Sequence, residues 1–313
     1  MGNKKLVFGK YKKILRIKIN HERAGFFAYF IFVLNQLRYC EKHNLFPVVY
    51  FGERSGIGFN KYFDPGHGDN MWDYYFDPVA GYTYKDICEM VDDPANPLKE
   101  EDIIELGGGD LWYLHKEDPE SIYGYTYGVY KSKEEFDGAG YNKQRRKASY
   151  FVDKYIKVKS HITEKVKEFY EKNMAGHNVL GIHLRGTDKG SAKASSNVMR
   201  VIGPEAYVKE IDKYSEKNPG CKIFVATDQE QYLEFMENKY GDRVISYDAI
   251  RSHNQKNPFQ VDDGKNYKKG EDALIDCLLL SKCNFFLKCT SHLGETALYF
   301  NPKLKCLDLN YLY

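Results

Sequence analysis

The stretch "NVLGIHLRGTDKG", residues 178–190, decides the fold of the C-terminal half of the chain. Its first part is an apolar run typical of a fully buried strand in a parallel sheet, and Arg185 follows that run directly. A guanidinium held at the end of a rigid strand is well suited to bidentate recognition of a phosphate. An isolated arginine at a strand end more often forms an ordinary salt bridge, so its interpretation depends on what the other strand ends carry.

The residues that follow this arginine are small or charged, as in a ligand-binding loop. Gly186 lets the backbone turn closely, and Thr187 can donate a hydrogen bond. Lys189 adds a second positive charge, whereas Asp188 is better suited to orienting one of the two cations than to acting alone. Together with Arg185 they form a candidate phosphate-binding loop.

From this strand onward, apolar strands alternate with helical segments. The predicted strands lie at 178–186, 221–228, 243–248, 284–291 and 303–309, and the predicted helices at 204–218, 229–241, 270–283 and 293–301. This alternation predicts a doubly wound parallel sheet. Such sheets bind ligands at the carboxyl ends of their strands, so the residues at those ends are the candidates for a site.

Two further strand ends carry polar side chains. The segment "VATD" places Thr227 and Asp228 after the second strand, where they can bind a ribose hydroxyl or steady the neighbouring loop. The segment "CTSHLGETA" places Thr290 and Ser291 at a helix N-terminus, a ready site for a phosphate. Each residue has an alternative role as an ordinary helix cap. The coincidence of three polar strand ends on one sheet edge favours a ligand site.

A pair of acids lies inside the predicted helix at 270–283. The segment "EDALID" puts Asp272 and Asp276 four residues apart, on one face of that helix. They precede the apolar run "CLLLS", and buried carboxylates need partners. A guanine ring, with its N1–H and amino donors, is one such partner.

The N-terminal half opens with a βαβ pattern. Residues 14–20 alternate as a strand does, a helical segment follows "NHERAG", and residues 46–52 form a second predicted strand. Residues 53–150 are aromatic, Gly-rich and irregular, and the sequence pattern assigns no regular structure there. Apolar residues at near-helical spacing predict one long helix within 150–173, bridging the two halves.

Composition limits the classes of protein that fit. A net charge of +2 argues against a nucleic-acid partner. Seven cysteines without a CxxC pair predict free thiols in a reducing compartment and no structural zinc. The longest apolar stretch, "GFFAYFIFVL", is too short to cross a membrane, and the start of the chain lacks the apolar core of a signal peptide. The basic N-terminus suits peripheral contact with an anionic membrane, although a solvated tail explains it more simply.

Aromatic residues gather in the irregular segment. They include Trp72, Tyr74, Tyr75, Trp112 and Tyr113. Aromatic rings with a polar edge suit sugar surfaces, but packing in a core explains them equally well. This segment is where we would look for stacking of an acceptor sugar.

Three segments now form a recognisable series: "HLRGTDK", then "FVATD", then "EDALIDCLLLSKCNFFLKCTS". In order and spacing they resemble the three motifs of the GDP-fucose-dependent fucosyltransferases. The most similar subgroup is that of the α-1,6-fucosyltransferases and the rhizobial nodulation fucosyltransferase, with the protein O-fucosyltransferases more distant. The match covers roughly residues 180–300, and the N-terminal half resembles the family only in its βαβ opening and Gly-containing loop.

The resemblance implies an α/β protein of the GT-B fold, with two Rossmann-like domains facing a cleft. We expect an acceptor-side domain at 1–150, a linker helix at 151–175, a nucleotide-sugar-binding domain at 176–300, and a final strand and tail at 301–313. The implied reaction inverts the anomeric carbon, from β-linked fucose in GDP-fucose to an α-glycoside. It requires neither a metal nor a cofactor, and GDP-fucose is the donor substrate.

The same resemblance assigns roles by position. Arg185 would hold the diphosphate and neutralise the leaving GDP, which is the dominant electrostatic task in such a displacement. His183 and Asp276 would contact the nucleoside, and Ser291 would contact the phosphate.

Two departures from the α-1,6 subgroup bear on the acceptor side. That subgroup has two consecutive arginines in its first motif and a glutamate shortly after it, whereas Gly186 follows Arg185 here and "GSAKASSN" contains no acid. The general base must therefore come from elsewhere, and the acceptor differs. Glu22, at the carboxyl end of the first predicted strand, is our candidate, because some O-fucosyltransferases use an acid in this loop. His21 is the second candidate, and a helix-start acid is the simple structural role for Glu22.

The sequence thus predicts an inverting, metal-independent fucosyltransferase that acts on a hydroxyl of a glycan or glycoconjugate. The alternatives are a GT-B glycosyltransferase with another nucleotide sugar and a catalytically inactive nucleotide- or glycan-binding protein. Since neither a signal peptide nor a membrane anchor is evident, we expect a cytoplasmic enzyme of microbial or viral origin and not a Golgi enzyme.

Overall fold

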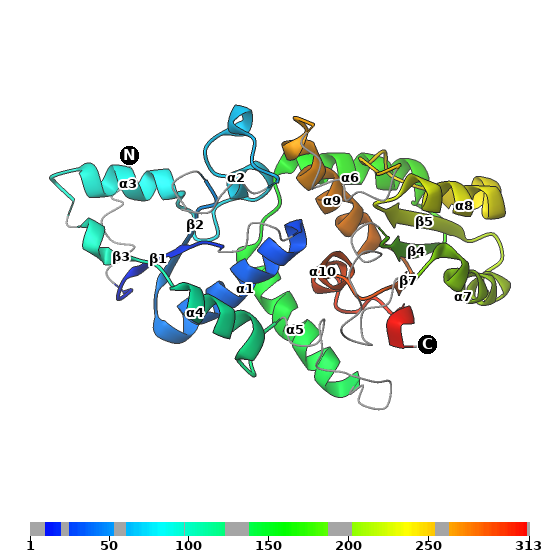
Figure 1. Ribbon diagram of the computed structural model, residues 1–313, viewed down its shortest axis with the longest axis horizontal. Helices are drawn as coiled ribbons and strands as arrows, with labels where there is room; N and C mark the ends of the chain where they lie inside the picture. Colours follow the sequence, from blue (N-terminus) through cyan, green and yellow to red (C-terminus); the bar gives the residue numbers. More distant parts are fainter. Residues whose placement is uncertain are drawn as a thin grey trace. The chain divides into compact units, whose positions relative to one another are not determined.

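The computed structural model describes residues 10–19, 25–52, 61–96, 98–122, 138–186, 202–253 and 263–311. The chain divides into two compact units. The first comprises Met1–Gly124 with Tyr150–Lys159, and the second comprises Tyr125–Ser149 with Ser160–Tyr313. Each unit has its own parallel sheet flanked by helices, as the sequence predicts (Figure 1).

The second unit is built on a five-stranded sheet in the order β6-β5-β4-β7-β8, with every pair parallel. Its strands are β4 (Val179–Leu184), β5 (Lys222–Thr227), β6 (Val244–Ile245), β7 (Phe285–Lys288) and β8 (Cys306–Asp308). The chain runs outward from β4 to β6 and then returns to the other side of β4. The switch point between β4 and β7 is where sheets of this kind bind ligands.

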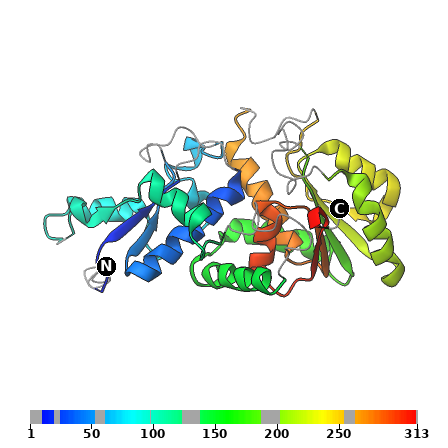
Figure 2. The same ribbon diagram turned by 60° about the horizontal axis from the view of Figure 1, so that its bottom comes forward.

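Helices cover both faces of this sheet. They are α6 (Ser160–Asn173), α7 (Pro204–Lys217), α8 (Glu230–Tyr240), α9 (Asn266–Leu280) and α10 (His292–Phe300). Helices α7 and α8 lie on one face, and α6, α9 and α10 on the other (Figures 1 and 2). This doubly wound arrangement confirms the predicted alternation of strands and helices.

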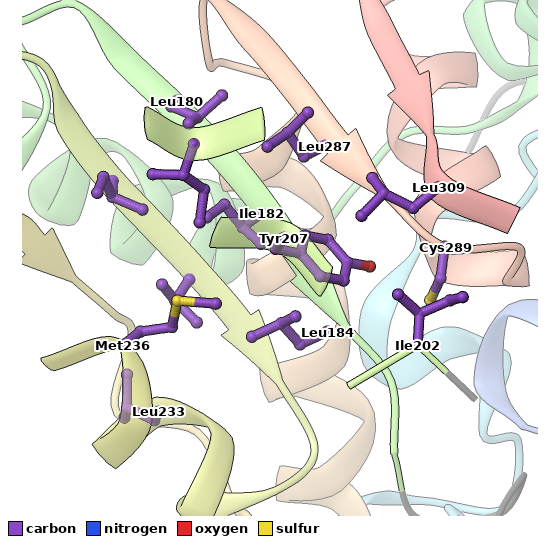
Figure 3. Close-up of a cluster of buried hydrophobic side chains, with 13 residues drawn as sticks. Leu180, Ile182, Leu184, Ile202, Tyr207, Leu233, Met236, Leu287, Cys289 and Leu309 are labelled. Atoms are coloured by element: carbon purple, nitrogen blue, oxygen red, sulfur yellow. The ribbon is translucent and has the colours of Figure 1, made fainter. Parts of the chain in front are cut away.

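Alternate residues of β4 determine which face receives which side chain. Leu180, Ile182 and Leu184 point into an apolar cluster with Tyr207 of α7 and Met236 of α8 (Figure 3). The residues between them, among which is His183, therefore point to the face of α9 and α10. The alternation that places Leu180, Ile182 and Leu184 in the core thus directs His183 towards α9 and α10.

Gly181 allows the second face to pack closely. A Cβ at this position would lie 2.8 Å from Cys283 Sγ and 3.2 Å from a methyl group of Leu280. Real Cβ atoms do not approach so closely, so any larger residue would force β4 and the end of α9 apart. The glycine in "VLGIHL" is therefore required by packing between the strand and the helix.

The first unit contains a smaller parallel sheet in the order β2-β1-β3. Strand β1 (Ile14–Ile17), helix α1 (Phe26–His43) and strand β2 (Phe46–Val49) form the predicted βαβ opening. Helix α1 is buried along most of its length, because aromatic side chains surround it on several sides. Strand β3 (Ile103–Ile104) completes the sheet.

Regular structure also occurs in the segment that the sequence pattern leaves unassigned. It contains α2 (Trp72–Tyr75), α3 (Tyr84–Asp92) and α4 (Gly108–Trp112), of which α4 continues into a π-helical turn, η5 (Tyr113–Glu117). Short 3-10 turns lie at η3 (Pro65–His67) and η4 (Glu100–Asp102) in this unit, and at η6 (Gly241–Arg243) and η8 (Leu309–Tyr311) in the second. The Thr83 hydroxyl accepts from Asp86 N–H, and the Asp86 carboxylate accepts from Thr83 N–H. This capping box fixes the start of α3.

The aromatic residues of this segment divide into two groups. Trp72, Tyr74 and Tyr75 are buried in the core of the first unit. Trp112 and Tyr113, by contrast, are 52% and 49% exposed. Core packing therefore accounts for the first three, and only the last two keep a ring surface that could meet a sugar.

The single long helix predicted within 150–173 is wrong. Helix α5 (Gly138–Tyr155) ends early, and α6 begins only at Ser160. Between them Val158 pairs with Phe76 in an antiparallel bridge, while Lys159 N–H donates to the Tyr75 carbonyl. Backbone groups of this extended segment bond to residues 75–77, which belong to the same unit, so a continuous helix is excluded there. The predicted linker at 151–175 is thus the end of one helix, an extended segment and a second helix.

Two findings concern the chain as a whole. Within its described part, no helix combines the length and the apolar character needed to span a membrane. The seven cysteines all lie in the described ranges and are free thiols, as predicted, and five of them are buried.

Candidate functional site

The ends of β4, β5 and β7 lie side by side in the sheet. His183 of β4 is the register partner of Ala226 in β5 and of Lys288 in β7. The residues that follow these strands therefore meet at one edge, as predicted. A hydrogen bond joins two of the ends: Gly186 N–H donates to Asp228 Oδ1 over 3.1 Å.

The end of β4 carries the first candidate residues. Arg185 follows the strand and is partly exposed, whereas Gly186 is buried. A Cβ on Gly186 would lie 2.7 Å from Gln229 Nε2 and from the Tyr232 ring, so this glycine lets the start of α8 approach the turn. Thr187, Asp188 and Lys189 lie outside the described residues, as do Glu22 and His21.

His183 and Ser291 are in direct contact across the switch point. Ser291 Oγ lies 3.0 Å from His183 Nδ1, and both side chains are buried. Ser291 Oγ also accepts from Gly294 N–H at 3.0 Å, which makes it the N-cap of α10. The alternative role of Ser291 as a cap is therefore real, and the same hydroxyl also holds the imidazole of His183.

A buried charge cluster supports the loop between β7 and α10. Lys288 is fully buried, and its Nζ lies 2.5 Å from both Glu295 Oε1 and Asp308 Oδ2. Thr290 is tied to the same cluster, since its hydroxyl donates to Asp308 Oδ2 at 3.4 Å and its N–H to Asn310 Oδ1 at 2.5 Å. Burial raises the pKa of Asp308, and the neighbouring Lys288 opposes this rise. Thr290 thus bonds inward to β8.

The sequence pattern did not predict the cluster of Lys288, Glu295 and Asp308, although Lys288 itself is an unusual residue at its position. A lysine in the apolar run "NFFLKC" is unusual, because a lysine is almost never fully buried unless it is paired. Its two partners are seven and twenty residues further along the chain. No spacing rule connects such positions before the fold is known.

The end of β5 is held by backbone and side-chain bonds. Thr227 Oγ1 accepts from Gln229 N–H at 3.2 Å, and Thr227 is buried. Helix α8 starts at Glu230 with Gln229 as its N-cap residue, so Asp228 is not the helix cap. Asp228 instead receives Gly186 N–H, and its carbonyl accepts from Ser252 N–H at 2.9 Å. It therefore steadies the neighbouring loop, one of the two roles predicted for this strand end.

The two acids of α9 have different environments. Asp272 bonds to Lys268 Nζ at 2.7 and 2.9 Å, and it accepts from Ile250 N–H at 2.9 Å. Asp276 is 5% exposed, and its Oδ1 has no hydrogen-bond partner among the residues that the structure describes. Burial raises the pKa of Asp276 to about 8, against the charge of the nearby Arg251. Asp272 is therefore a structural residue, whereas Asp276 is available to a ligand.

Metal ligands are not evident at this edge. Over the described ranges, no group of three or more His, Cys, Asp and Glu side chains is arranged to hold a metal ion. Two hydrogen-bonded pairs lie at this edge, His183 with Ser291 and Gly186 with Asp228, and Asp276 lies on α9.

We compared the sequence and the fold with those of known proteins. No model of a protein family matches the sequence, and no curated protein sequence matches it. Among solved structures, the NodZ α-1,6-fucosyltransferase co-crystallised with GDP is similar, with a TM-score of 0.53 and 15% identity over 94% of this chain and 93% of that one. The fucosyltransferase NodZ from Bradyrhizobium has a TM-score of 0.52 and 15% identity, with 91% and 92% covered. POFUT1 in complex with GDP-fucose has a TM-score of 0.51 and 11% identity, with 94% and 96% covered.

These similarities extend over nearly the whole of each chain. The class defined by two α/β units, the second doubly wound, is the GT-B fold. More particularly, the chain has the fold of the fucosyltransferases NodZ and POFUT1. This agrees with the resemblance of its three sequence motifs to that family.

Proposed function

We propose that this protein is a fucosyltransferase that transfers L-fucose from GDP-fucose to a hydroxyl of a glycan or glycoconjugate. The observation that carries the proposal is the bond between His183 and Ser291 at the switch point of the sheet. It joins the first and third motif segments in a fold shared with enzymes whose structures contain GDP or GDP-fucose. Capping of α10 explains the serine, but it does not require a histidine at position 183.

The site residues suit the leaving group of such a transfer. The diphosphate of GDP gains negative charge as the glycosidic bond breaks, so fixed positive charge and N–H donors nearby stabilise the transition state. Arg185 supplies the charge, and the N-terminus of α10 at Ser291 supplies oriented N–H groups with the positive end of the helix dipole. These groups perform the electrostatic work without a metal, and we propose a metal-independent reaction.

For the acceptor side we propose that Glu22 is the general base. It would take the proton of the acceptor hydroxyl as that oxygen attacks the anomeric carbon from the face opposite GDP, which inverts the configuration. Glu22→Gln should lower the turnover number by about 10²–10⁴ while GDP affinity stays unchanged. Transfer rates and calorimetric titration of the same preparation check the two parts. Turnover within a few-fold of the wild-type value would remove Glu22 from this role, and His21→Gln would then be measured.

The nucleotide and the chemistry can be tested separately. Calorimetric titration with GDP, UDP and ADP should show tightest binding of GDP, and slow hydrolysis of GDP-fucose without an acceptor should release fucose. Arg185→Met should lower GDP affinity because a phosphate contact is lost, whereas Arg243→Met, outside the site, should not. Equal affinity for GDP and UDP would contradict the proposal. GDP binding without hydrolysis or transfer would indicate a binding protein instead.

A further inference from the structure

A buried arginine, Arg251, lies near Asp276. The side chain of Arg251 is 6% exposed, and its positive charge acts on the Asp276 carboxyl. Arg251 lies in the segment between β6 and α9, where neither periodicity nor a motif draws attention to it. Neither the proposed phosphate contacts nor the proposed general base involves this residue.

Hydrogen bonds attach this arginine to the edge that carries the candidate site. The adjacent residue, Ser252, forms a parallel bridge with Gln229, and its N–H donates to the Asp228 carbonyl. Asp228 in turn receives Gly186 N–H from the loop after β4. On the other side, the Asp272 carboxylate of α9 accepts from Ile250 N–H. Arg251 is therefore fixed between the end of β5 and the face of α9 that carries Asp276.

The hydrogen-bonding capacity of the two side chains is only partly used. Arg251 Nη2 donates to the Tyr247 carbonyl at 2.5 Å, and Nη1 is 3.9 Å from a Glu230 carboxylate oxygen. Arg251 Nε and Asp276 Oδ1 are both buried and have no hydrogen-bond partner within the described ranges. A buried charged group without partners is costly, so such pairs are normally completed by a ligand or by each other. Here no ion pair joins the two within 4.0 Å among the described residues.

The Arg251 guanidinium is a hydrogen-bond donor and the Asp276 carboxylate is an acceptor. A ligand that fits both must present acceptors to the arginine and donors to the aspartate. Guanine has acceptors at O6 and N7, and next to them donors at N1–H and the 2-amino group. An arginine binds O6 and N7 in a bidentate manner, which is the commonest specific contact to guanine, and a carboxylate binds the adjacent donors. Adenine has an amino donor in place of O6. This donor would face the N–H donors of the arginine, and no hydrogen bond would form. Uracil lacks both N7 and the 2-amino group.

We propose that Arg251 is a specificity-determining residue that binds the O6 and N7 edge of the donor's guanine, while Asp276 binds N1–H and the 2-amino group. This assignment rests on the proposed use of a guanine nucleotide, and it adds the residue that distinguishes guanine from other bases. When the guanine is bound, the positive charge of the guanidinium also favours the ionised form of Asp276 that the guanine donors require.

The test uses nucleotides that each lack one group. The full-length protein is titrated calorimetrically with GDP, with 7-deaza-GDP, which lacks N7, and with IDP, which lacks the 2-amino group. On the wild type, each analogue should bind roughly tenfold or more weakly than GDP, as expected when a hydrogen bond to a charged group is lost. Arg251→Lys keeps the positive charge beside Asp276 but loses the bidentate geometry. In this variant the ratio of GDP to 7-deaza-GDP affinity should fall to about one, while the ratio of GDP to IDP affinity stays as in the wild type.

Each other outcome has a definite meaning. Equal affinity of the wild type for GDP and 7-deaza-GDP would overturn the role of Arg251. So would an Arg251→Lys variant that binds all three nucleotides more weakly by the same factor, because that pattern indicates a structural effect. Arg243→Lys, which changes an arginine stacked on Tyr240 outside the site, is the matched control and should leave all ratios unchanged. If GDP binds no better than UDP, the proposed function fails first, and the two failures are thereby distinguished.

Discussion

At the scale of single residues, most polar groups of the site form hydrogen bonds with one another, whereas one carboxylate oxygen has no such partner among the described residues. Ser291 caps α10 and holds His183, and Asp228 receives the Gly186 amide, so these groups are preorganised. Asp276 is different, because its Oδ1 has no partner among the described residues and burial raises its pKa to about 8. A group that is protonated in the free protein and ionised when bound links nucleotide affinity to pH.

This linkage gives a prediction with a definite sign. The pKa of Asp276 is about 8 in the folded protein against 3.8 for an ordinary aspartate, so between those values the folded state holds a proton that the unfolded state has lost. The contribution of Asp276 to stability is therefore greatest below pH 4 and decreases as pH rises towards 8, by at most about 1.4 kcal/mol per pH unit. GDP binding that requires the carboxylate should release a proton and strengthen over the same range.

Two measurements with one variant check this prediction. Urea unfolding of the wild type and of Asp276→Asn, compared from pH 5 to 8, should show a difference in unfolding free energy that changes with pH, since the amide does not titrate. Calorimetric titration of GDP in buffers of different ionisation enthalpy should detect proton release by the wild type but not by the variant. A pH-independent difference together with no proton release would show that Asp276 is ionised throughout.

At the scale of elements, the buried Lys288 joins three of them. It lies at the end of β7 and contacts Glu295 of α10 and Asp308 of β8. These contacts set the direction in which α10 leaves the sheet, and hence where its N-terminus and Ser291 lie. The cluster supports the site without reaching it, because Lys288 is fully buried.

Removal of this lysine should destabilise the protein strongly. Lys288→Met leaves two buried carboxylates without their cation, which we expect to cost about 3–5 kcal/mol of unfolding free energy. The triple variant Lys288→Met, Glu295→Gln, Asp308→Asn removes all three charges and should recover much of that loss. Urea unfolding measures both, and Lys222→Met, at the half-exposed start of β5, serves as the control. Equal stability of Lys288→Met and the wild type would show that the carboxyls are protonated in the native state.

At the scale of the whole molecule, the two units should respond differently to a nucleotide. At 100 times its dissociation constant, GDP should stabilise the state that binds it by about 2.7 kcal/mol. Hydrogen exchange should therefore slow in the second unit, most of all at the end of β4, in the segment between β7 and α10, and in 247–252. Peptides from α3 in the first unit should change least, and UDP at the same concentration should protect less. Protection confined to the first unit would contradict the assignment of the site.

Much of this architecture is predictable from sequence because buried parallel strands are continuous apolar runs. The five strands of the second unit, the four helices α7 to α10 and the meeting of the polar strand ends follow from that pattern. The break between α5 and α6 does not, since apolar residues keep helical spacing across 156–159 while the backbone there bonds to the segment around Phe76. Helix α3 was identifiable from its capping residues, Thr83 and Asp86, but not from its composition.

The candidate site is predictable to a smaller degree. His183, Asp228 and Ser291 stand at strand ends, so the fold class alone brings them together. Lys288 and Arg251 act through partners distant in sequence, and their roles depend on burial, which arises only when the strands and helices are packed. The sequence therefore locates the edge of the sheet that carries the site, whereas the groups that support it and select among ligands require the structure.

The division of the aromatic residues has a spectroscopic consequence. The chain has two tryptophans, and both lie in the first unit, Trp72 buried and Trp112 about half exposed. Emission excited at the red edge of tryptophan absorption therefore reports on the first unit only, with a buried and a solvated fluorophore that an aqueous quencher can separate. Far-ultraviolet circular dichroism reports on both units. The two signals will coincide during denaturation only when the halves of the molecule unfold as one, so the protein carries a built-in probe of their cooperativity.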